Sequence, residues 1–283
     1  NNSRNNSRNN SRNNSRNNSR NKHTIHMLIT SKDNPAVKAL KKLLTSTKRS
    51  DARMVIEGIH ACETFLAHQK PLLVWVGESA QMHVEIAPLL MQVRAARITV
   101  HILPDALFRD LSTLEQGVSL LFEVERPVYT DFVGTGNAVV LDGVQDPGNM
   151  GSILRSAAAA GVHTVYLSSA CANPFAPKVL RAAVGAHCSL AIFEHVDMGA
   201  LFVHLQTAGI QTIATSSYVA NDLYDLDLNR PVAWVFGNEG TGIAQAWIEA
   251  AEARAYIPMS SGESLNVAAA AAVCLFEMRR QQR

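Results

Sequence analysis

From residue 138 onward, short apolar runs alternate with stretches in which apolar positions recur at helical spacing. The apolar runs are rich in β-branched residues and predict strands at 138–141, 164–167, 190–193, 211–214, 232–236 and 255–259. The periodic stretches predict helices that continue through 160, cover 177–184, follow a cap at Asp197, cover 244–252, and run from Ser264 to the C-terminus. Strands and helices in alternation are typical of a parallel sheet that is covered on both faces.

A smaller set of elements precedes this region. Asn34 as a cap and Pro35 at the first helical position predict a helix through Leu44, with Val37, Leu40 and Leu44 on its inner face. Further elements are predicted as strand 54–57, helix 59–67, strand 72–76, helix 84–93, strand 98–102, a short helix capped by Asp105, and strand 118–124. This order indicates a compact α/β domain.

The pattern divides the chain into a tail at 1–22, a domain at 23–126, a linker at 127–136 and a second domain at 137–283. The tail begins with Asn-Asn-Ser-Arg repeated five times and contains no apolar residue to bury. Because it cannot offset the entropy lost on ordering, we expect it to be disordered. It is either a basic tail that touches nucleic acid or a repeat expansion or artificial addition.

Composition narrows the protein class. With 47% hydrophobic and 18% charged residues over 283 positions, the chain can bury a sizeable core. It has no run of eighteen apolar residues and no apolar signal core near residue 1, so we expect a cytoplasmic enzyme outside the membrane. The four cysteines form no CxxC pair and the ten histidines show no metal-ligand spacing, which predicts reduced core thiols and no metal site.

Charge is distributed unevenly along the chain. The net formal charge is +5 over residues 1–20, +2 over 21–126 and −5 over 127–283. Only the front of the chain is therefore expected to attract a polyanion, although a lysine-rich helix can also be an ordinary solvated face. The candidate contacts are Lys38, Lys41, Lys42, Lys48 and Arg49.

Candidate chemistry lies in three loops that follow predicted strands. None of them contains GxGxxG or the lysine of a P-loop, so the common nucleotide fingerprints are absent. The loops instead carry polar side chains to strand–helix junctions, where ligands of parallel sheets bind. These are Asn149 with Arg155, Glu239, and Ser264 with Asn266. Taken singly, each could be a helix cap, a surface residue or a loop acid.

Taken together, the loops resemble the motifs of a known family. The sequences are DPGNMGSILR at 146–155, FGNEGTG at 236–242, and IPM at 257–259 followed by SLNV at 264–267. In this order they resemble the SpoU (TrmH) branch of the SPOUT methyltransferases, which methylate ribose 2′-hydroxyls of RNA with S-adenosylmethionine. The resemblance covers 137–283 and, more loosely, 31–125, which is similar to the ribosomal-protein-like substrate-binding domain of rRNA-directed members.

The resemblance implies an α/β C-terminal domain with a deep trefoil knot, and a homodimer formed through that domain. Close backbone approach in a knot would suit Gly237, Gly262 and the alanine run 268–272. By the same resemblance, the cofactor is held through Thr215, Gly237, Ile257, Met259 and Leu265. Arg155 would be the catalytic arginine, with the site shaped by Asn149, Glu239, Ser264 and Asn266. The charge distribution, in turn, predicts that the front domain supplies most of the RNA affinity, through Lys38, Lys41, Lys42, Lys48 and Arg49.

Two questions stay open at this point. Neutralising an arginine side chain near pH 7 costs roughly 7 kcal/mol, which favours a charged Arg155 that grips a phosphate, but a neutral Arg155 acting as base is the alternative. The substrate could be rRNA, favoured by the separate front domain, or tRNA. A non-catalytic RNA-binding ribosome-assembly factor of the same fold is a third possibility, against which the retained polar residues argue.

Overall fold

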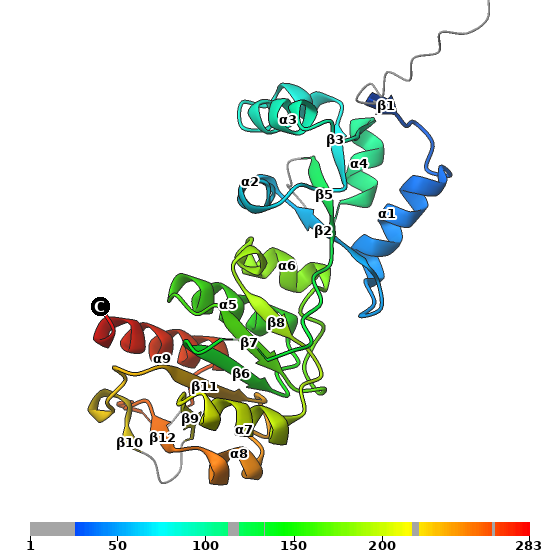
Figure 1. Ribbon diagram of the computed structural model, residues 1–283. Helices are drawn as coiled ribbons and strands as arrows, with labels where there is room; N and C mark the ends of the chain where they lie inside the picture. Colours follow the sequence, from blue (N-terminus) through cyan, green and yellow to red (C-terminus); the bar gives the residue numbers. More distant parts are fainter. Residues whose placement is uncertain (1–25, 113–118, 133, 217–220, 262–263) are drawn as a thin grey trace, which may run out of the picture.

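The computed structural model describes residues 26–112, 119–132, 134–216, 221–261 and 264–283 (Figure 1). The predicted disordered tail at 1–22 lies outside these ranges, as do Val118 and Gly262. Within the described ranges, no helix has both the length and the apolar character needed to cross a membrane.

The C-terminal half, here called the C-lobe, is built on a parallel sheet, as predicted. Its strands lie in the order β10-β12-β9-β11-β6-β7-β8, and every described pairing between them is parallel. Their bounds are β6 Ala138–Asp142, β7 Thr164–Leu167, β8 Ala191–Phe193, β9 Gln211–Thr215, β10 Asn221–Asp222, β11 Val232–Gly237 and β12 Ala253–Tyr256. The two-residue β10 is too short to produce a pattern in the sequence.

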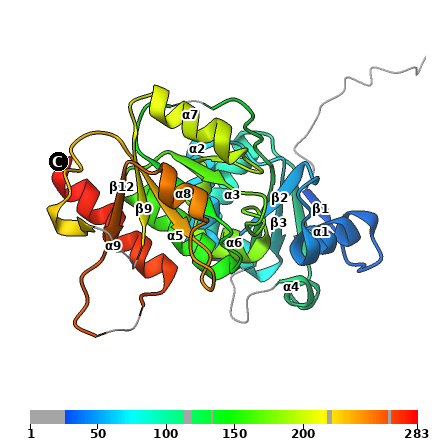
Figure 2. The ribbon, with the colours of Figure 1, turned by 90° about the horizontal axis from the view of Figure 1, so that it is seen from below.

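Helices cover both faces of this sheet (Figures 1 and 2). Strand β11 shows why, since all its residues are buried and successive side chains point to opposite faces. Trp234 packs into the apolar core shared with α5 (Pro147–Ala159), α6 (Pro177–Ala183) and α9 (Val267–Gln281). Val235 packs into the core shared with α7 (Met198–Thr207) and α8 (Gln245–Ala250).

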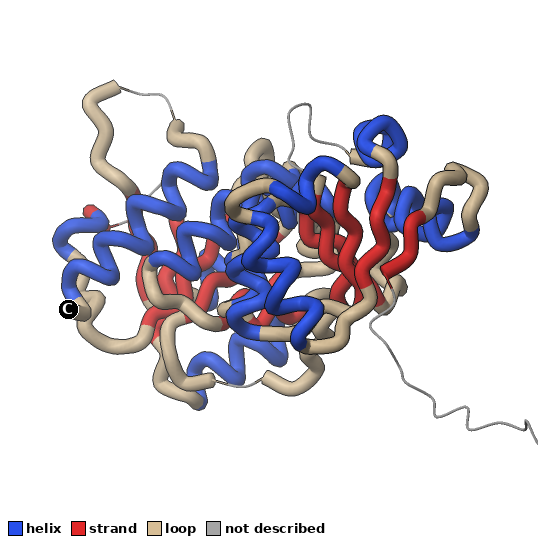
Figure 3. The backbone as a smooth tube through the Cα atoms, turned by 90° about the horizontal axis from the view of Figure 1, so that it is seen from above, coloured by secondary structure: helices blue, strands red, loops and turns tan. Residues whose placement is uncertain are grey.

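The N-terminal half, here called the N-lobe, carries a mixed sheet in the order β1-β4-β3-β5-β2. Strand β5 is antiparallel to its neighbours, whereas β1, β4 and β3 are parallel. Their bounds are β1 His26–Leu28, β2 Arg53–Glu57, β3 Leu73–Gly77, β4 Val100–Leu103 and β5 Leu120–Glu125. Helices α1 (Pro35–Ser46) and α4 (Asp105–Leu111) pack on one face, and α2 (Ile59–His68) and α3 (Ile86–Ala95) on the other. The two sheets stand as separate groups of strands in Figure 3.

The first residues of the helices show whether the predicted capping residues act as caps. The Asn34 side chain accepts a hydrogen bond from the Ala36 N–H at 2.9 Å, which confirms the predicted start of α1. Asp105 does not cap α4, because Pro104 holds the cap position and the Asp105 carboxylate accepts instead from the Ser79 N–H at 3.1 Å. The helix predicted at 84–93 begins later, at Ile86, after a 3-10 turn over Ser79–Met82.

The stretch around the third motif also differs from the prediction. Strand β12 ends at Tyr256, so the IPM segment at 257–259 lies in a loop and not in a strand. Helix α9 begins at Val267 and not at Ser264, because the Asn266 side chain accepts from the N–H groups of Ala268 and Ala269 and caps the helix there. The loop between β12 and α9 is therefore longer than predicted, and it leaves Ser264 exposed.

The two lobes are joined by a cluster of charges, here called the lobe clamp. The Glu194 carboxylate accepts from Arg49 at 2.7 Å and also pairs with Arg126. Arg126 in turn lies over the ring of Phe175, 4.8 Å from its centroid, and Arg49 donates to the Cys171 carbonyl. Only 5% of the Arg126 side chain is exposed, so this pairing takes place largely out of water.

Candidate active site

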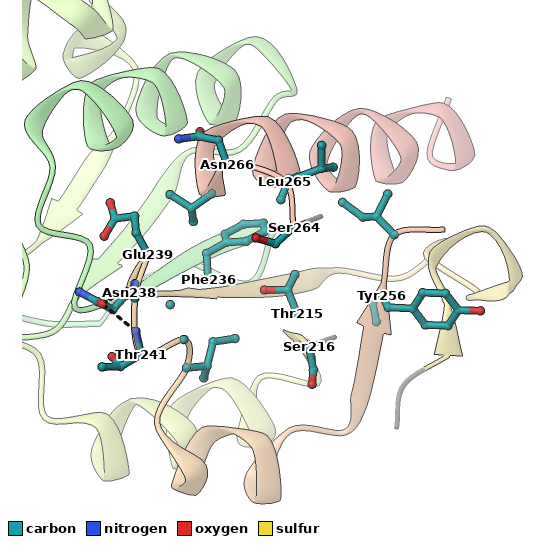
Figure 4. Close-up of a pocket in the computed structure, with 18 of the residues that line it drawn as sticks. Thr215, Ser216, Phe236, Asn238, Glu239, Thr241, Tyr256, Ser264, Leu265 and Asn266 are labelled. Carbon is teal, nitrogen blue, oxygen red and sulfur yellow. Dashed lines mark hydrogen bonds between the residues drawn. The ribbon is translucent and has the colours of Figure 1, made fainter. Parts of the chain in front are cut away.

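A cavity of about 670 Å³ opens at the carboxyl ends of β9, β11 and β12 (Figure 4). It is enclosed by the loops that follow these strands and by the first turn of α9. The residues predicted for cofactor binding all lie in its lining, namely Thr215, Gly237, Ile257, Met259 and Leu265. Glu239, Ser264 and Asn266 line it too, whereas Asn149 and Arg155 do not.

Glycines, apolar side chains and polar side chains together line the cavity. The Thr215 hydroxyl donates to the Val235 carbonyl at 3.0 Å, so this hydroxyl is already engaged within the sheet. The backbone of residues 242 and 243 passes so close to residue 237 that only glycine fits there. A Cβ on Gly237 would lie 2.3 Å from the Gly242 carbonyl carbon and 2.4 Å from the Ile243 nitrogen. A cavity of this size and character suits a nucleoside-sized ligand held by main-chain hydrogen bonds.

Asn238 organises the loop after β11, a role that the sequence did not assign. Its Oδ1 accepts from the N–H groups of Gly240 and Thr241 at 2.8 and 3.0 Å, and its Nδ2 donates to the Gly143 carbonyl at 2.8 Å. The backbone of Asn238 also exchanges two hydrogen bonds with Gly242, which sits at a φ of +73°. The position of an asparagine inside a glycine-rich turn was the signal that could have indicated this role.

Three of the predicted site residues form a direct chain at one end of the cavity. Asn149 Nδ2 donates to Glu239 Oε1 at 3.0 Å, and Asn266 Nδ2 donates to Asn149 Oδ1 at 3.0 Å. Asp146, not Asn149, caps α5, because its carboxylate accepts from the Asn149 N–H at 2.7 Å. The Asn149 side chain is therefore free of capping and links the first, second and third motif loops.

Arg155 lies on α5 but is not part of the hydrogen-bonded series of Glu239, Asn149 and Asn266. Its side chain is exposed and forms no hydrogen bond or ion pair with any other residue that the structure describes. Six residues correspond to about 9 Å along a helix and to a rotation of about 120° away from Asn149. Its guanidinium is thus available for a group that arrives from solvent.

The predicted polyanion contacts separate into two groups. Lys41, Lys42 and Lys48 are exposed, and Lys38 is exposed and pairs with Asp33 at 3.1 Å. Arg49 differs, because it is half-buried in the lobe clamp and its guanidinium is turned onto the C-lobe. Arg49 therefore does not lie with the exposed lysines, because it pairs with Glu194, which is distant in sequence.

The cysteines take no part in the site. All four are free thiols, and burial raises the pKa of Cys188 to about 11 and that of Cys274 to about 12. Such thiols stay neutral and unreactive near pH 7. In the described ranges, no three His, Cys, Asp or Glu side chains come together as a metal site.

The sequence was compared with known protein families and with individual proteins. A family model described as the SpoU rRNA Methylase family matches residues 136–276. A Synechocystis protein described as an uncharacterized tRNA/rRNA methyltransferase is 34% identical over 260 residues, which span 90% of this chain and 94% of that protein. The chain belongs to the SpoU methylase family. The 23S rRNA (guanosine-2′-O-)-methyltransferase RlmB of Shewanella oneidensis is 30% identical over 81% of this chain and 98% of its own length.

Solved structures of SpoU relatives share the fold. An RNA 2′-O ribose methyltransferase superposes with a TM-score of 0.76 at 29% identity, covering 90% of this chain and 99% of its own. An AdoMet-bound rRNA methyltransferase from Sinorhizobium meliloti superposes with a TM-score of 0.78 at 26% identity, covering 90% and 98%. The likeness thus extends beyond the C-lobe alone.

Gly237 provides a test of the cavity. We expect Gly237→Ala to lower the affinity for S-adenosylmethionine at least tenfold, about 1.4 kcal/mol. The added methyl group would meet backbone atoms of Gly242 and Ile243, which cannot rotate away as a side chain could. Isothermal titration calorimetry measures the affinity, and Gly136→Ala is the control because its Cβ would meet nothing within 4 Å. An unchanged affinity in Gly237→Ala would show that the cavity is not the cofactor site.

Proposed function

We propose that this protein transfers a methyl group from S-adenosylmethionine to a ribose 2′-hydroxyl of RNA, in large-subunit rRNA. The observation that carries the proposal is the contact of Asn149 with Glu239 and with Asn266, each a hydrogen bond of 3.0 Å between residues distant in sequence, beside a cavity that Glu239 and Asn266 line. Relatives of nearly full-length similarity that are named 23S rRNA 2′-O-methyltransferases support the substrate class.

The cavity suits the cofactor. S-adenosylmethionine supplies an electrophilic methyl group on a positively charged sulfur. Thr215, Gly237, Ile257, Met259 and Leu265 would hold it through main-chain groups and apolar contact, since all five line the cavity. Glu239 lies at one end of the same cavity, and Tyr256 lies at the other (Figure 4).

The hydrogen-bonded series of Glu239, Asn149 and Asn266 would position the acceptor ribose. Glu239 and both asparagines fix one another's orientation, so their remaining hydrogen-bonding capacity points in set directions, and Ser264 adds a hydroxyl on the same rim. Arg155 would grip the phosphate next to the acceptor and stabilise negative charge that develops on the ribose oxygen. Arg155 would act through its positive charge and its planar fork of donors, and the acceptor proton would leave to water.

The remaining architecture of the family is proposed on the same basis. We propose a deep trefoil knot, and the packing of the alanine-rich helix α9 against α5 supports it. We also propose a homodimer formed through the C-lobe. The division into a ribosomal-protein-like substrate-binding domain at 23–126, a linker at 127–136 and a catalytic domain at 137–283 follows the two sheets. Lys38, Lys41, Lys42 and Lys48 would then supply RNA contacts of the front domain.

The decisive experiment concerns the acceptor atom. We expect an unmodified transcript of the large-subunit rRNA to accept tritiated methyl groups from S-adenosylmethionine, and an otherwise identical target fragment with a 2′-deoxy nucleotide at the acceptor to accept none. RNA binding should change only a few fold, because one hydroxyl is lost from a large contact.

The other outcomes are equally informative. Methylation of the 2′-deoxy fragment would mean that a base is the acceptor and would refute the proposed chemistry. Methylation of a tRNA pool and not of the rRNA transcript would move the substrate to tRNA. Binding of rRNA without transfer to any RNA would identify a ribosome-assembly factor that has kept the fold.

A further inference from the structure

Three helices that contact one another in series carry positive charge and no acidic residue. They are α1, α6 and α5, which follow one another from the outer side of the N-lobe to the active site (Figures 1 and 2). Their basic residues are Lys38, Lys41, Lys42, Lys178, Arg181 and Arg155. This row stands out because residues 127–283 have a net charge of −5 and contain a single lysine, Lys178.

Sheet topology places Lys178 on the edge of the molecule that holds the cavity. In a parallel sheet all carboxyl ends lie at one edge, and β11, β6 and β7 are neighbours in that order. The cavity lies at the end of β11, α5 begins after β6, and α6 begins after β7. The start of α6 therefore lies one strand further from the cavity than the start of α5 does, on the side toward the N-lobe. Lys178 is the second residue of α6.

Packing holds α6 firmly between its neighbours. Gly151 of α5 lets the two helices touch, since a Cβ there would lie 2.4 Å from the Ala182 Cβ and 2.8 Å from the Val179 carbonyl oxygen. On the other side, Arg181 pairs with Glu57 at the end of β2, at 3.6 Å. Arg181 thus binds α6 to the N-lobe, whereas Lys178 takes no part in this contact.

Lys178 has no acidic partner among the residues that the structure describes. Its side chain is exposed and makes no hydrogen bond or ion pair with any residue in the described ranges. The nearest acid of α5 is its cap, Asp146, whose carboxylate accepts from the Asn149 N–H. A lysine that lies between a basic helix and Arg155, both side chains having no partner in the described part of the chain, is suited to bind a series of phosphates.

We infer that Lys178 contacts the RNA sugar–phosphate backbone between α1 and the active site, so that the flanking RNA runs across α6 before the acceptor nucleotide reaches Arg155. This inference rests on the proposed function, because it takes RNA as the substrate. It assigns a binding residue to the C-lobe, whose overall negative charge otherwise disfavours RNA.

The test compares Lys178→Glu and Lys178→Arg with Lys70→Glu in the full chain. Lys70 is exposed and follows α2, which packs on the face of the N-lobe sheet opposite α1. Binding of an unmodified large-subunit rRNA transcript is measured by filter binding at several salt concentrations. We expect Lys178→Glu to weaken binding about tenfold and to reduce the magnitude of the negative slope of log K against log salt by about one. Lys178→Arg should match the wild type, and Lys70→Glu should change binding less than twofold.

Two further readouts separate this role from a structural one. S-adenosylmethionine affinity and the thermal midpoint should be unchanged in Lys178→Glu, and KM for RNA should rise while kcat at saturating RNA is kept. Binding within twofold of the wild type, or an equal loss in Lys70→Glu, would overturn the inference. Failure of the wild type to methylate the transcript would instead refute the proposed function, since the binding measurement does not depend on transfer.

Discussion

Arg155→Ala is expected to lower kcat by roughly a hundredfold to a thousandfold, the loss typical when a group that stabilises developing charge is removed. Arg155 is exposed and has no partner among the described residues, so its removal breaks no contact that maintains the fold. It lies outside the cavity lining, and the affinity for S-adenosylmethionine should therefore change less than twofold. Single-turnover methylation and calorimetry measure the two quantities.

Arg155→Lys is the matched control for this prediction. Lysine keeps the positive charge but loses the planar fork that can hold two oxygens at once, so an intermediate rate is expected. A tenfold or greater loss of cofactor affinity in Arg155→Ala, about 1.4 kcal/mol, would place Arg155 in the cofactor site and contradict the role assigned to it.

Glu194→Ala should lower the free energy of unfolding by about 3–5 kcal/mol, the range found when one member of a buried ion pair is removed. The substitution leaves Arg126, with 5% of its side chain exposed, and Arg49, with 27% exposed, beside each other without a carboxylate. Two guanidinium groups would then repel each other in a place that water reaches poorly. Urea unfolding followed by far-UV circular dichroism measures the change.

The exposed pair between Arg230 and Glu252 offers the comparison. Both side chains are about half exposed, at 47% and 52%, so Glu252→Ala should cost less than about 1 kcal/mol. Equal effects of Glu194→Ala and Glu252→Ala would show that the lobe clamp contributes no more than a surface ion pair. The clamp also holds the segment that follows α1 against the C-lobe, through Arg49.

Local patterns in the sequence were sufficient for most of the elements. Val232, Trp234 and Phe236 alternate with Ala233 and Val235 because β11 is buried on both faces, and such a run needs no knowledge of its neighbours. The start of α1 was equally local, since Asn34 bonds a residue two positions away. Strands β1 and β10 were missed because two or three residues acquire strand structure only by pairing with β4 and β12.

The sequence by itself thus determined the α/β class, the family and the identity of the polar residues in the three motif loops. Only the tertiary structure decided which of them touch. Asn149 meets Glu239 and Asn266 across 90 and 117 residues, because the order of strands in the C-lobe sheet brings the three motifs together. Arg49 meets Glu194 across 145 residues, because the two lobes are in contact at that point. Spacing along the chain does not reveal such contacts, whereas a helix cap such as Asn34 depends on neighbours a few residues away.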